Sequence, residues 1–471
     1  MGGAGFRGVL LRLRSRWAAT LALATLIAGC AAPGVPPADD LACLGPPGPV
    51  PGAAATFPLR VQPNRRQLVD AAGRPFLVVG DAAWSLLAQL SEPDAQAYLR
   101  DRSERGFTTV LVNLLEHKFA IRAPADLDGD PPFLVPGDFA TPNERYFAHV
   151  DRVLELARRL NLLVLLAPAY LGNGGGDEGW YAVMRANGPD KLRAFGRYVG
   201  RRYRSYPNIV WVQAGDFDPP ERDLVTAVAE GIAAEDPAAL QTAHGARGST
   251  ALDRWAGAAW LSFSTVYGGD IYALSVQHYE RSTLPFVAIE GIYEDESGAT
   301  PALIRAQAYQ AVLGGAAGHV FGNNPIWHFD GPGIYTPPRP WRQALASEGA
   351  RDMTVWTSLL TRLPWWRLRP DRRAELVTDP SGEGADQVVA ALACDRSFGM
   401  VYVPAGREIE VDPAKLAGGN AELVWYDPGT GRMIGTAIER STARFRVRAP
   451  DPPGDRVLVL RGVRAPAQPP G

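Results

Sequence analysis

The feature that most constrains the fold is an alternation of short apolar runs with helical patterns between residues 58 and 368. Such alternation is typical of parallel sheets whose strands are joined by crossover helices. We predict eight strands, at residues 76–80, 108–113, 162–167, 208–216, 239–244, 259–265, 286–290 and 319–323. This number favours a closed (β/α)8 (TIM) barrel, with functional side chains at the carboxyl ends of the strands.

An open, doubly wound sheet is the alternative, but no G-x-G-x-x-G or Walker sequence follows an early strand. Three crossover helices have recognisable starts. Ser91 is followed by a proline and an acid in the first turn, Asn143 precedes apolar residues at helical spacing, and Asp190 opens a further amphipathic run. We therefore predict a barrel domain over residues 58–368.

After Pro370 the helical periodicity stops, and short apolar strands separated by Pro-Gly and Asp-Gly turns take over. Strands at this spacing are typical of an antiparallel β-sandwich. We predict a second, all-β domain over residues 370–465, and we find no nucleophile constellation in it.

The amino terminus has the pattern of an export signal. Four arginines and no acid precede an apolar stretch at residues 17–27, which is too short to span a bilayer but suits a signal-peptide core. The stretch ends in Leu26–Cys30, which resembles a bacterial lipobox, so we predict a signal peptide over residues 1–29 and a lipid on Cys30. An ordinary signal peptide with a chance cysteine is the alternative.

Residues 30–57 are rich in Ala, Pro and Gly and have no hydrophobic period, which predicts a tether between the lipid anchor and the folded chain. Ala31 rather than aspartate follows the cysteine, and by resemblance to Gram-negative lipoproteins this implies the outer membrane of a bacterial cell envelope. Removing four arginines with the signal would change the formal charge from −2 to −6.

Composition and cysteine count exclude other classes. With 48 basic and 50 acidic side chains, the chain has no basic excess for nucleic acid. Cys30, Cys43 and Cys394 cannot form a disulfide scaffold, and none lies in a C-x-x-C motif. The sequence predicts no cofactor, and it does not predict an oligomeric state.

Carboxylates at the ends of buried strands are the strongest candidates for chemistry, because burying them is costly unless they are paired or used. Asp81, Asp216 and Glu290 stand at such positions. Two carboxylates in one cleft suit glycoside hydrolysis, in which one protonates the leaving oxygen and the other attacks or stabilises the sugar cation. The structural alternative is that Asp216 caps a loop and Glu290 pairs with an arginine.

Metal and serine chemistry have weaker support. The histidines form neither H-x-H nor H-E-x-x-H, and no G-x-S-x-G is present, so we predict no metal and no serine triad. Aromatic rings near strand ends could stack on sugar faces, although each alone is more often core packing. The predicted substrate-binding residues are Asp81, Trp84, Asn113, His244, Tyr267, Tyr293, His319, Asn323 and Trp327.

Several segments together resemble the apiosidase-like glycoside hydrolases, family 140 and its relatives. They are residues 80–84, 143–151, 203–211, 290–294 and 318–327. The domain after Pro370 resembles the small domain commonly appended to this family and often labelled collagen-binding, a label that we do not take as a sign of collagen binding.

The resemblance implies a (β/α)8 glycosidase acting on a plant or bacterial poly- or oligosaccharide, with retention expected. It places the family's acid/base aspartate on Asp216 and its nucleophile on Glu290, while Asp81, His244 and His319 would orient sugar hydroxyls. Ala214 replaces a glycine of the family motif, and Gly291 replaces its proline. The competing hypothesis is an inactive, surface-anchored glycan-binding lipoprotein.

Overall fold

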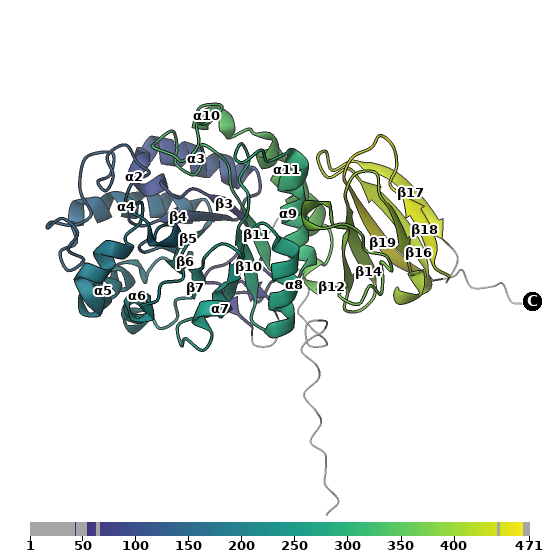
Figure 1. Cartoon of the computed structure of the whole chain (residues 1–471), viewed down its shortest axis with the longest axis horizontal. Helices are drawn as coiled ribbons and strands as arrows, with labels where there is room; N and C mark the ends of the chain where they lie inside the picture. Colours follow the sequence, from purple (N-terminus) through teal and green to yellow (C-terminus); the bar gives the residue numbers. More distant parts are fainter. Residues whose placement is uncertain (1–42, 44–53, 63–65, 440–442, 465–471) are drawn as a thin grey trace, which may run out of the picture. The chain divides into compact units, whose positions relative to one another are not determined.

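A computed structural model describes the chain except for residues 1–42, 44–53, 63–65, 440–442 and 465–471 (Figure 1). The predicted signal peptide, the lipidated Cys30 and most of the predicted tether lie outside the described residues. Within the part of the chain that is described, no helix is both long and apolar enough to cross a membrane.

The predicted barrel is confirmed, in a nearly closed form. Its parallel strands are β3 (Val78–Ala82), β4 (Thr109–Asn113), β5 (Leu163–Ala167), β6 (Ile209–Ala214), β7 (Gln241–His244), β9 (Ser264–Tyr267), β10 (Phe286–Glu290) and β11 (Gly318–Phe321). Hydrogen-bonded neighbours follow the order β7-β6-β5-β4-β3-β11-β10-β9, and the short antiparallel strand β8 (Ser249–Thr250) pairs with β9. A separate hairpin joins β1 (Arg60–Val61) to β2 (Leu68–Val69).

Hydroxyl side chains help to close the seam between β7 and β9. The Thr242 hydroxyl donates to the carbonyl of Phe263 at 2.8 Å, and the Thr265 hydroxyl donates to the carbonyl of Ala243 at 2.5 Å. In a regular strand ladder these carbonyl groups would accept hydrogen bonds from backbone N–H groups, and here the hydroxyl groups satisfy them instead. The eight strands therefore surround one interior, unlike an open sheet.

Helices surround the barrel strands (Figure 1). They are α2 (Leu86–Gln89), α3 (Glu92–Glu104), α4 (Glu144–Arg159), α5 (Tyr181–Tyr203), α6 (Arg222–Glu235), α7 (Ala251–Trp255), α8 (Ile271–Arg281), α9 (Pro301–Leu313), α10 (Trp341–Ala344) and α11 (Glu348–Thr361). The Ser91 and Asn143 side chains cap α3 and α4 as predicted, accepting from the backbone N–H groups of Asp94 and Arg145.

Several predicted boundaries are wrong by two residues or more. The helix expected from Asp190 is the second half of α5, which begins at Tyr181 and is interrupted at Gly188, where φ is +71°. The strand expected over residues 259–265 begins only at Ser264. The first barrel strand starts at Val78 and continues to Ala82, so Asp81 lies inside the strand and does not follow it.

The predicted antiparallel domain follows the barrel. Its strands are β12 (Leu368–Pro370), β13 (Val389–Ala393), β14 (Phe398–Val403), β15 (Glu408–Val411), β16 (Gly419–Tyr426), β17 (Met433–Glu439), β18 (Phe445–Arg448) and β19 (Arg456–Arg464). Six of them form one sheet in the order β12-β13-β14-β19-β16-β17, and β15 pairs with β18. The sequence patterns did not predict β17, whose side chains are mostly exposed or half-buried.

One disulfide joins Cys43 to Cys394, across a sequence separation of 351 residues. It ties the segment before the barrel to the turn between β13 and β14 of the second domain. The sequence patterns assign no role to either cysteine, because nothing in their spacing brings them together.

Candidate active site

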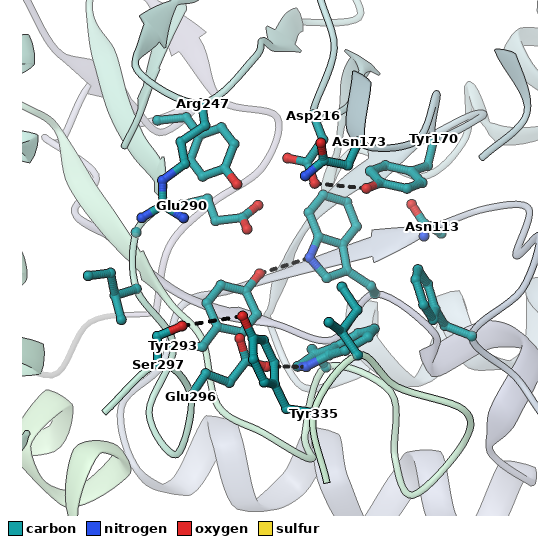
Figure 2. A pocket seen from close by; sticks show the side chains of 17 residues that line it. Asn113, Tyr170, Asn173, Asp216, Arg247, Glu290, Tyr293, Glu296, Ser297 and Tyr335 are labelled. Atoms are coloured by element: carbon teal, nitrogen blue, oxygen red, sulfur yellow. Dashed lines mark hydrogen bonds between the residues drawn. The ribbon is translucent and has the colours of Figure 1, made fainter. Parts of the chain in front are cut away.

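A cavity of about 180 Å³ lies at the carboxyl ends of the barrel strands (Figure 2). Its wall comprises Trp84, Asn113, Phe119, Tyr170, Asn173, Asp216, Arg247, Tyr267, Glu290, Gly291, Ile292, Tyr293, Glu296, Ser297, Trp327, Ile334 and Tyr335. Most of these residues belong to loops that follow strands, which is where a barrel gathers its functional groups.

An unusual backbone turn delivers Asp216 to this cavity. Three successive residues, beginning with the last residue of β6, have positive φ: Ala214 at +66°, Gly215 at +131° and Asp216 at +53°. A side chain at Gly215 would place its Cβ only 2.4 Å from the Tyr170 ring, so glycine allows the close approach. Backbone strain of this kind is concentrated at functional sites.

The Asp216 carboxylate is held by Tyr170, whose hydroxyl donates to Oδ2 at 2.8 Å. The other oxygen, Oδ1, is buried and has no hydrogen-bond partner within the described residues. One side of the carboxylate is thus fixed while the other keeps an unused acceptor.

A bulge in β10 turns Glu290 toward the cavity. Val287 and Ile289 point into the barrel core, so strict alternation would point the next side chain outward. The pairing with β9 shifts register between Ala288 and Glu290, which changes the direction of the last residue. Figure 2 shows the Glu290 and Asp216 carboxylates pointing into the same space.

His244, at the end of β7, lies between the two carboxylates and is fully buried. Its Nδ1 lies 3.1 Å from the backbone N–H of Asp216, which needs a lone pair there, and 3.2 Å from the carbonyl of Gly245, which needs a proton. Both the neutral ring with its proton on Nε2 and the protonated ring donate from Nε2 to Oε2 of Glu290, 2.7 Å away. Each of these two forms supports an ionised Glu290.

The electrostatics of the three groups are linked. Burial and the charge of Asp216 raise the pKa of Glu290, while the hydrogen bond from His244 opposes them. Burial alone would lower the pKa of His244, but its bond to Glu290 and the two carboxylate charges raise it on balance. Burial and the charge of Asp216 also raise the pKa of Tyr170, which keeps its hydroxyl a donor.

Another part of the cavity wall contains hydrogen-bonded pairs of aromatic and acidic side chains. The indole N–H of Trp84 donates to the Tyr293 hydroxyl at 2.9 Å, and that of Trp327 donates to Glu296 at 2.8 Å. Burial raises the pKa of Glu296 to about 7. Arg247 adds an exposed guanidinium to the cavity wall.

Most of the predicted site residues meet at this cavity. Those in its wall are Trp84, Asn113, Asp216, Tyr267, Glu290, Tyr293 and Trp327. His244 touches both carboxylates. The structure therefore brings the two carboxylates together with most of the predicted aromatic residues.

Asp81, His319 and Asn323 do not reach the cavity wall, which corrects their expected contact with sugar. Asp81 is buried on the side of β3 that faces α3, where Arg102 Nε and the Tyr98 hydroxyl each lie 2.8 Å from Oδ2. Burial raises its pKa to about 6. The strand includes this residue, so its side chain alternates away from the interior.

His319 and Asn323 are buried for other reasons. Val320 points into the barrel core, so its neighbour His319 points the other way, and burial lowers the pKa of His319 to about 3. The Asn323 amide donates to Glu294 at 2.8 Å. Their positions near strand ends did not reveal which face of the strand they occupy.

Sequence reasoning missed several members of the cavity. Tyr170 is not among the predicted substrate-binding residues, although it donates a hydrogen bond directly to Asp216. Arg247 and Glu296 are also missing from the predicted residues. Each lies a few residues beyond a predicted strand end, at His244 and Glu290. Their place in the loops that follow these strands was the available signal.

Among the described residues, Asp216, His244 and Glu290 form the group whose donor atoms are close enough to hold a metal ion, all within 4.8 Å of one another. Two carboxylates and an imidazole would suit several divalent metals. The His244–Glu290 contact of 2.7 Å is a hydrogen-bond distance, however, and a metal would have to replace that bond.

The sequence matches the family described as "Apiosidase-like, catalytic domain" over residues 62–367. It also matches the "Putative collagen-binding domain of a collagenase" over residues 370–461. No curated protein matches the sequence.

Solved structures share the fold. One, named "Glycoside hydrolase", has 22% sequence identity and a TM-score of 0.76, covering 88% of this chain and 99% of that chain. Another, a glycoside hydrolase of family 5 from Bacteroides vulgatus ATCC 8482, has 21% identity and a TM-score of 0.75, covering 86% of this chain and 93% of that chain.

Proposed function

The chain belongs to the apiosidase-like family and is a glycosidase, and we propose that it works by a two-carboxylate, retaining mechanism. The observation that carries the proposal is the pair of carboxylates in one cavity. One carboxylate oxygen of Asp216 and one of Glu290 lie within 4.8 Å of each other. Retaining enzymes hold their carboxyl groups about 5–5.5 Å apart, whereas inverting enzymes need about 6.5–9.5 Å to admit a water.

In the proposed first step, a carboxylate oxygen of Glu290 forms a bond to the anomeric carbon. The bond from that carbon to the leaving oxygen breaks, and Asp216 gives its proton to that oxygen. In the second step Asp216 takes a proton from water, whose oxygen replaces Glu290 at the anomeric carbon and releases the sugar. His244 supports the attack because it donates to Glu290 and so favours the ionised form.

The substrate proposal is a plant or bacterial poly- or oligosaccharide, supported by the family match and by the aromatic wall of the cavity. A panel of aryl pentosides, aryl hexosides and oligosaccharides tests it, with released sugar as the readout. Binding without release would favour an inactive glycan-binding protein instead. The paired carboxylates favour catalysis, because a binding protein has no need for them at this spacing.

Two variants test the assigned roles. Glu290→Ala and Asp216→Asn should each reduce turnover by at least about 10³-fold, since each removes a group that forms or breaks a bond. Asp223→Asn, an exposed carboxylate in the first turn of α6, is the matched control and should leave turnover unchanged. Nuclear magnetic resonance of the first-formed sugar should show the anomeric configuration of the substrate. Full activity in either active-site variant would refute the roles, and inverted product would refute retention.

We also propose that the protein is a lipid-anchored component of the bacterial cell envelope. The lipobox-like segment ending at Cys30 supports this location. The Cys43–Cys394 disulfide supports export, because such bonds persist in oxidising compartments. Cys30→Ala should abolish acyl labelling and partition into detergent, and unchanged labelling would show that the anchor is elsewhere or absent.

A further inference from the structure

The segment that follows Glu290 forms much of the cavity wall. Within residues 291–297, the wall includes Gly291, Ile292, Tyr293, Glu296 and Ser297. Glu294 is absent from the wall and is buried, with 8% of its surface exposed. An acidic side chain buried in this way needs partners, and those partners lie outside the cavity.

Four hydrogen bonds fix Glu294 to two neighbouring elements. Its Oε1 accepts from the backbone N–H of Gly349 at 2.8 Å, and its Oε2 accepts from the Asn323 amide at 2.8 Å. Its backbone N–H donates to Gly322, and its carbonyl accepts from Asn324. Glu294 therefore links the cavity wall to the loop after β11 and to the first turn of α11.

The contact with α11 depends on a close approach. A Cβ at Gly349 would lie 2.7 Å from Oε2 of Glu294, so a larger residue would force the carboxylate out. The carboxylate also faces the amino end of the helix, where backbone N–H groups favour negative charge. The position of α11 thus helps to set the position of Glu294.

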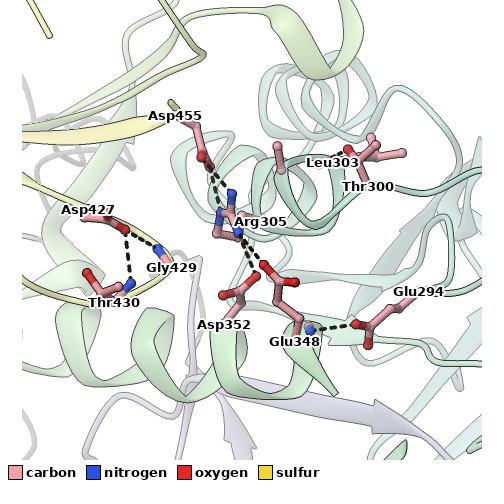
Figure 3. Close-up of polar contacts among 12 residues, drawn as sticks. Glu294, Thr300, Leu303, Arg305, Glu348, Asp352, Asp427, Gly429, Thr430 and Asp455 are labelled. Carbon is pink, nitrogen blue, oxygen red and sulfur yellow. Dashed lines mark hydrogen bonds and ion pairs between the residues drawn. The ribbon is translucent and has the colours of Figure 1, made fainter. Parts of the chain in front are cut away.

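The second domain in turn holds α11 through Arg305 of α9 (Figure 3). The Arg305 guanidinium donates to both oxygens of Asp455 at 2.8 Å and to Asp352 of α11 at 2.9 Å. Asp455 lies just before β19 and also accepts from the Tyr402 hydroxyl of β14 at 2.9 Å. All three charged groups are largely buried, so the pairing is poorly screened by solvent.

Apolar packing reinforces the same contact. One hydrophobic cluster contains Met353 and Trp356 of α11 together with Met400 and Val459 of the second domain. In the same cluster, the ring of Tyr309 on α9 stacks on that of Tyr402, with centroids 5.2 Å apart. The helices behind the cavity wall and the second domain therefore share one core.

We propose that the second domain supports the catalytic cavity, and that Glu294 is the positioning residue through which α11 holds segment 291–297 in place. The support runs from Asp455 through Arg305 and Asp352 to α11, and from Gly349 to Glu294. Its importance for catalysis rests on the proposed function, since Tyr293 and Glu296 then contact the substrate. The contacts themselves do not depend on that function.

Hydrogen–deuterium exchange of the full chain tests the support without any substrate. Glu294→Ala and Asp455→Asn should each speed exchange in peptides covering residues 291–297, by about tenfold. Asp412→Asn is the matched control, because Asp412 is an equally buried aspartate of the second domain that pairs with Arg444 away from α9 and α11. If Asp455→Asn speeds exchange in α9 and β14 but leaves residues 291–297 as in the wild type, the proposal is wrong.

Kinetics with the aryl glycoside that the wild type hydrolyses fastest supply the second readout. Glu294→Ala should lower kcat by about 10- to 100-fold with a smaller change in KM, because a displaced wall misplaces the reacting groups. Glu294→Gln should restore most of the activity. The Gln oxygen can accept from Gly349, and its amide can donate to Oδ1 of a flipped Asn323, an atom that has no partner within the described residues.

A Gln variant as impaired as the Ala variant would contradict the positioning role. If the exchange results are as expected but the wild type hydrolyses no glycoside, the proposed function fails and the support stands. If the wild type is active and Glu294→Ala has wild-type kcat and exchange, the support itself is refuted.

Discussion

The bond between His244 and Glu290 gives a prediction about the pH dependence of catalysis. Replacing His244 with Phe keeps an aromatic ring but removes the donor to the carboxylate. A hydrogen bond to a charged group contributes about 1.5–3 kcal/mol. Its loss should reduce the ionised fraction of Glu290 at acidic pH by about 10- to 100-fold, since about 1.4 kcal/mol corresponds to a factor of ten.

The direction of the pH shift follows from the proposed roles of His244 and Glu290. His244 lowers the pKa of Glu290 against burial and the Asp216 charge, which raise it. Removing His244 therefore raises this pKa further, and a nucleophile must be ionised to attack. The acidic limb of kcat/KM against pH should move to higher pH in His244→Phe, and activity should recover at pH values above the limb.

The assay is kcat/KM across the pH range with the best aryl glycoside. His244→Gln retains an amide donor and should move the limb less. His319→Phe, which replaces a buried imidazole that does not line the cavity, should not move it at all. An unchanged acidic limb in His244→Phe would refute the reasoning. A shift of the basic limb alone would show that Glu290 acts as the acid.

Three further results are expected. Arg102→Met should lower the free energy of unfolding by about 3–5 kcal/mol in denaturant titrations, because it leaves Asp81 buried without its charged partner, while kcat per folded molecule stays near wild type. A selective loss of kcat would indicate that Asp81 does belong to the active site. Cys394→Ser should lower the unfolding free energy by about 2–4 kcal/mol, as should reduction of the wild type, and an unchanged value would mean that the bond does not constrain the unfolded chain. Dialysis against a chelator should leave hydrolysis unchanged, since the proposed mechanism uses only protein groups. If activity is lost and a divalent metal restores it, Asp216, His244 and Glu290 are metal ligands.

Strand positions and the two carboxylates were predictable from the sequence because each depends on local pattern. Apolar runs such as residues 163–167 are buried on both faces, and their ends mark the cavity. Glu290 is the last residue of such a strand, and Asp216 comes two residues after the end of another. The order of the strands around the barrel then brought the two side chains together.

The direction of individual side chains was less predictable. Asp81 lies inside its strand and faces a helix, so a shift of two residues in the predicted boundary placed it on the wrong side. Glu290 reaches the cavity only through a bulge, and Asp216 only through three residues with positive φ. Irregularities of this kind depend on tertiary packing, which periodicity does not record.

The disulfide could not be predicted from the sequence for a related reason, because 351 residues separate its two cysteines. Its consequence is mechanical. A pull on the chain before Cys43 reaches the turn between β13 and β14 directly through the sulfur atoms, as well as the barrel through the backbone. The two cysteines also close residues 43–394 into a covalent ring that contains the whole barrel, so a single cut in any barrel loop would leave both pieces joined. The catalytic domain therefore stays attached to the rest of the chain at both of its ends even when one of its loops is cut.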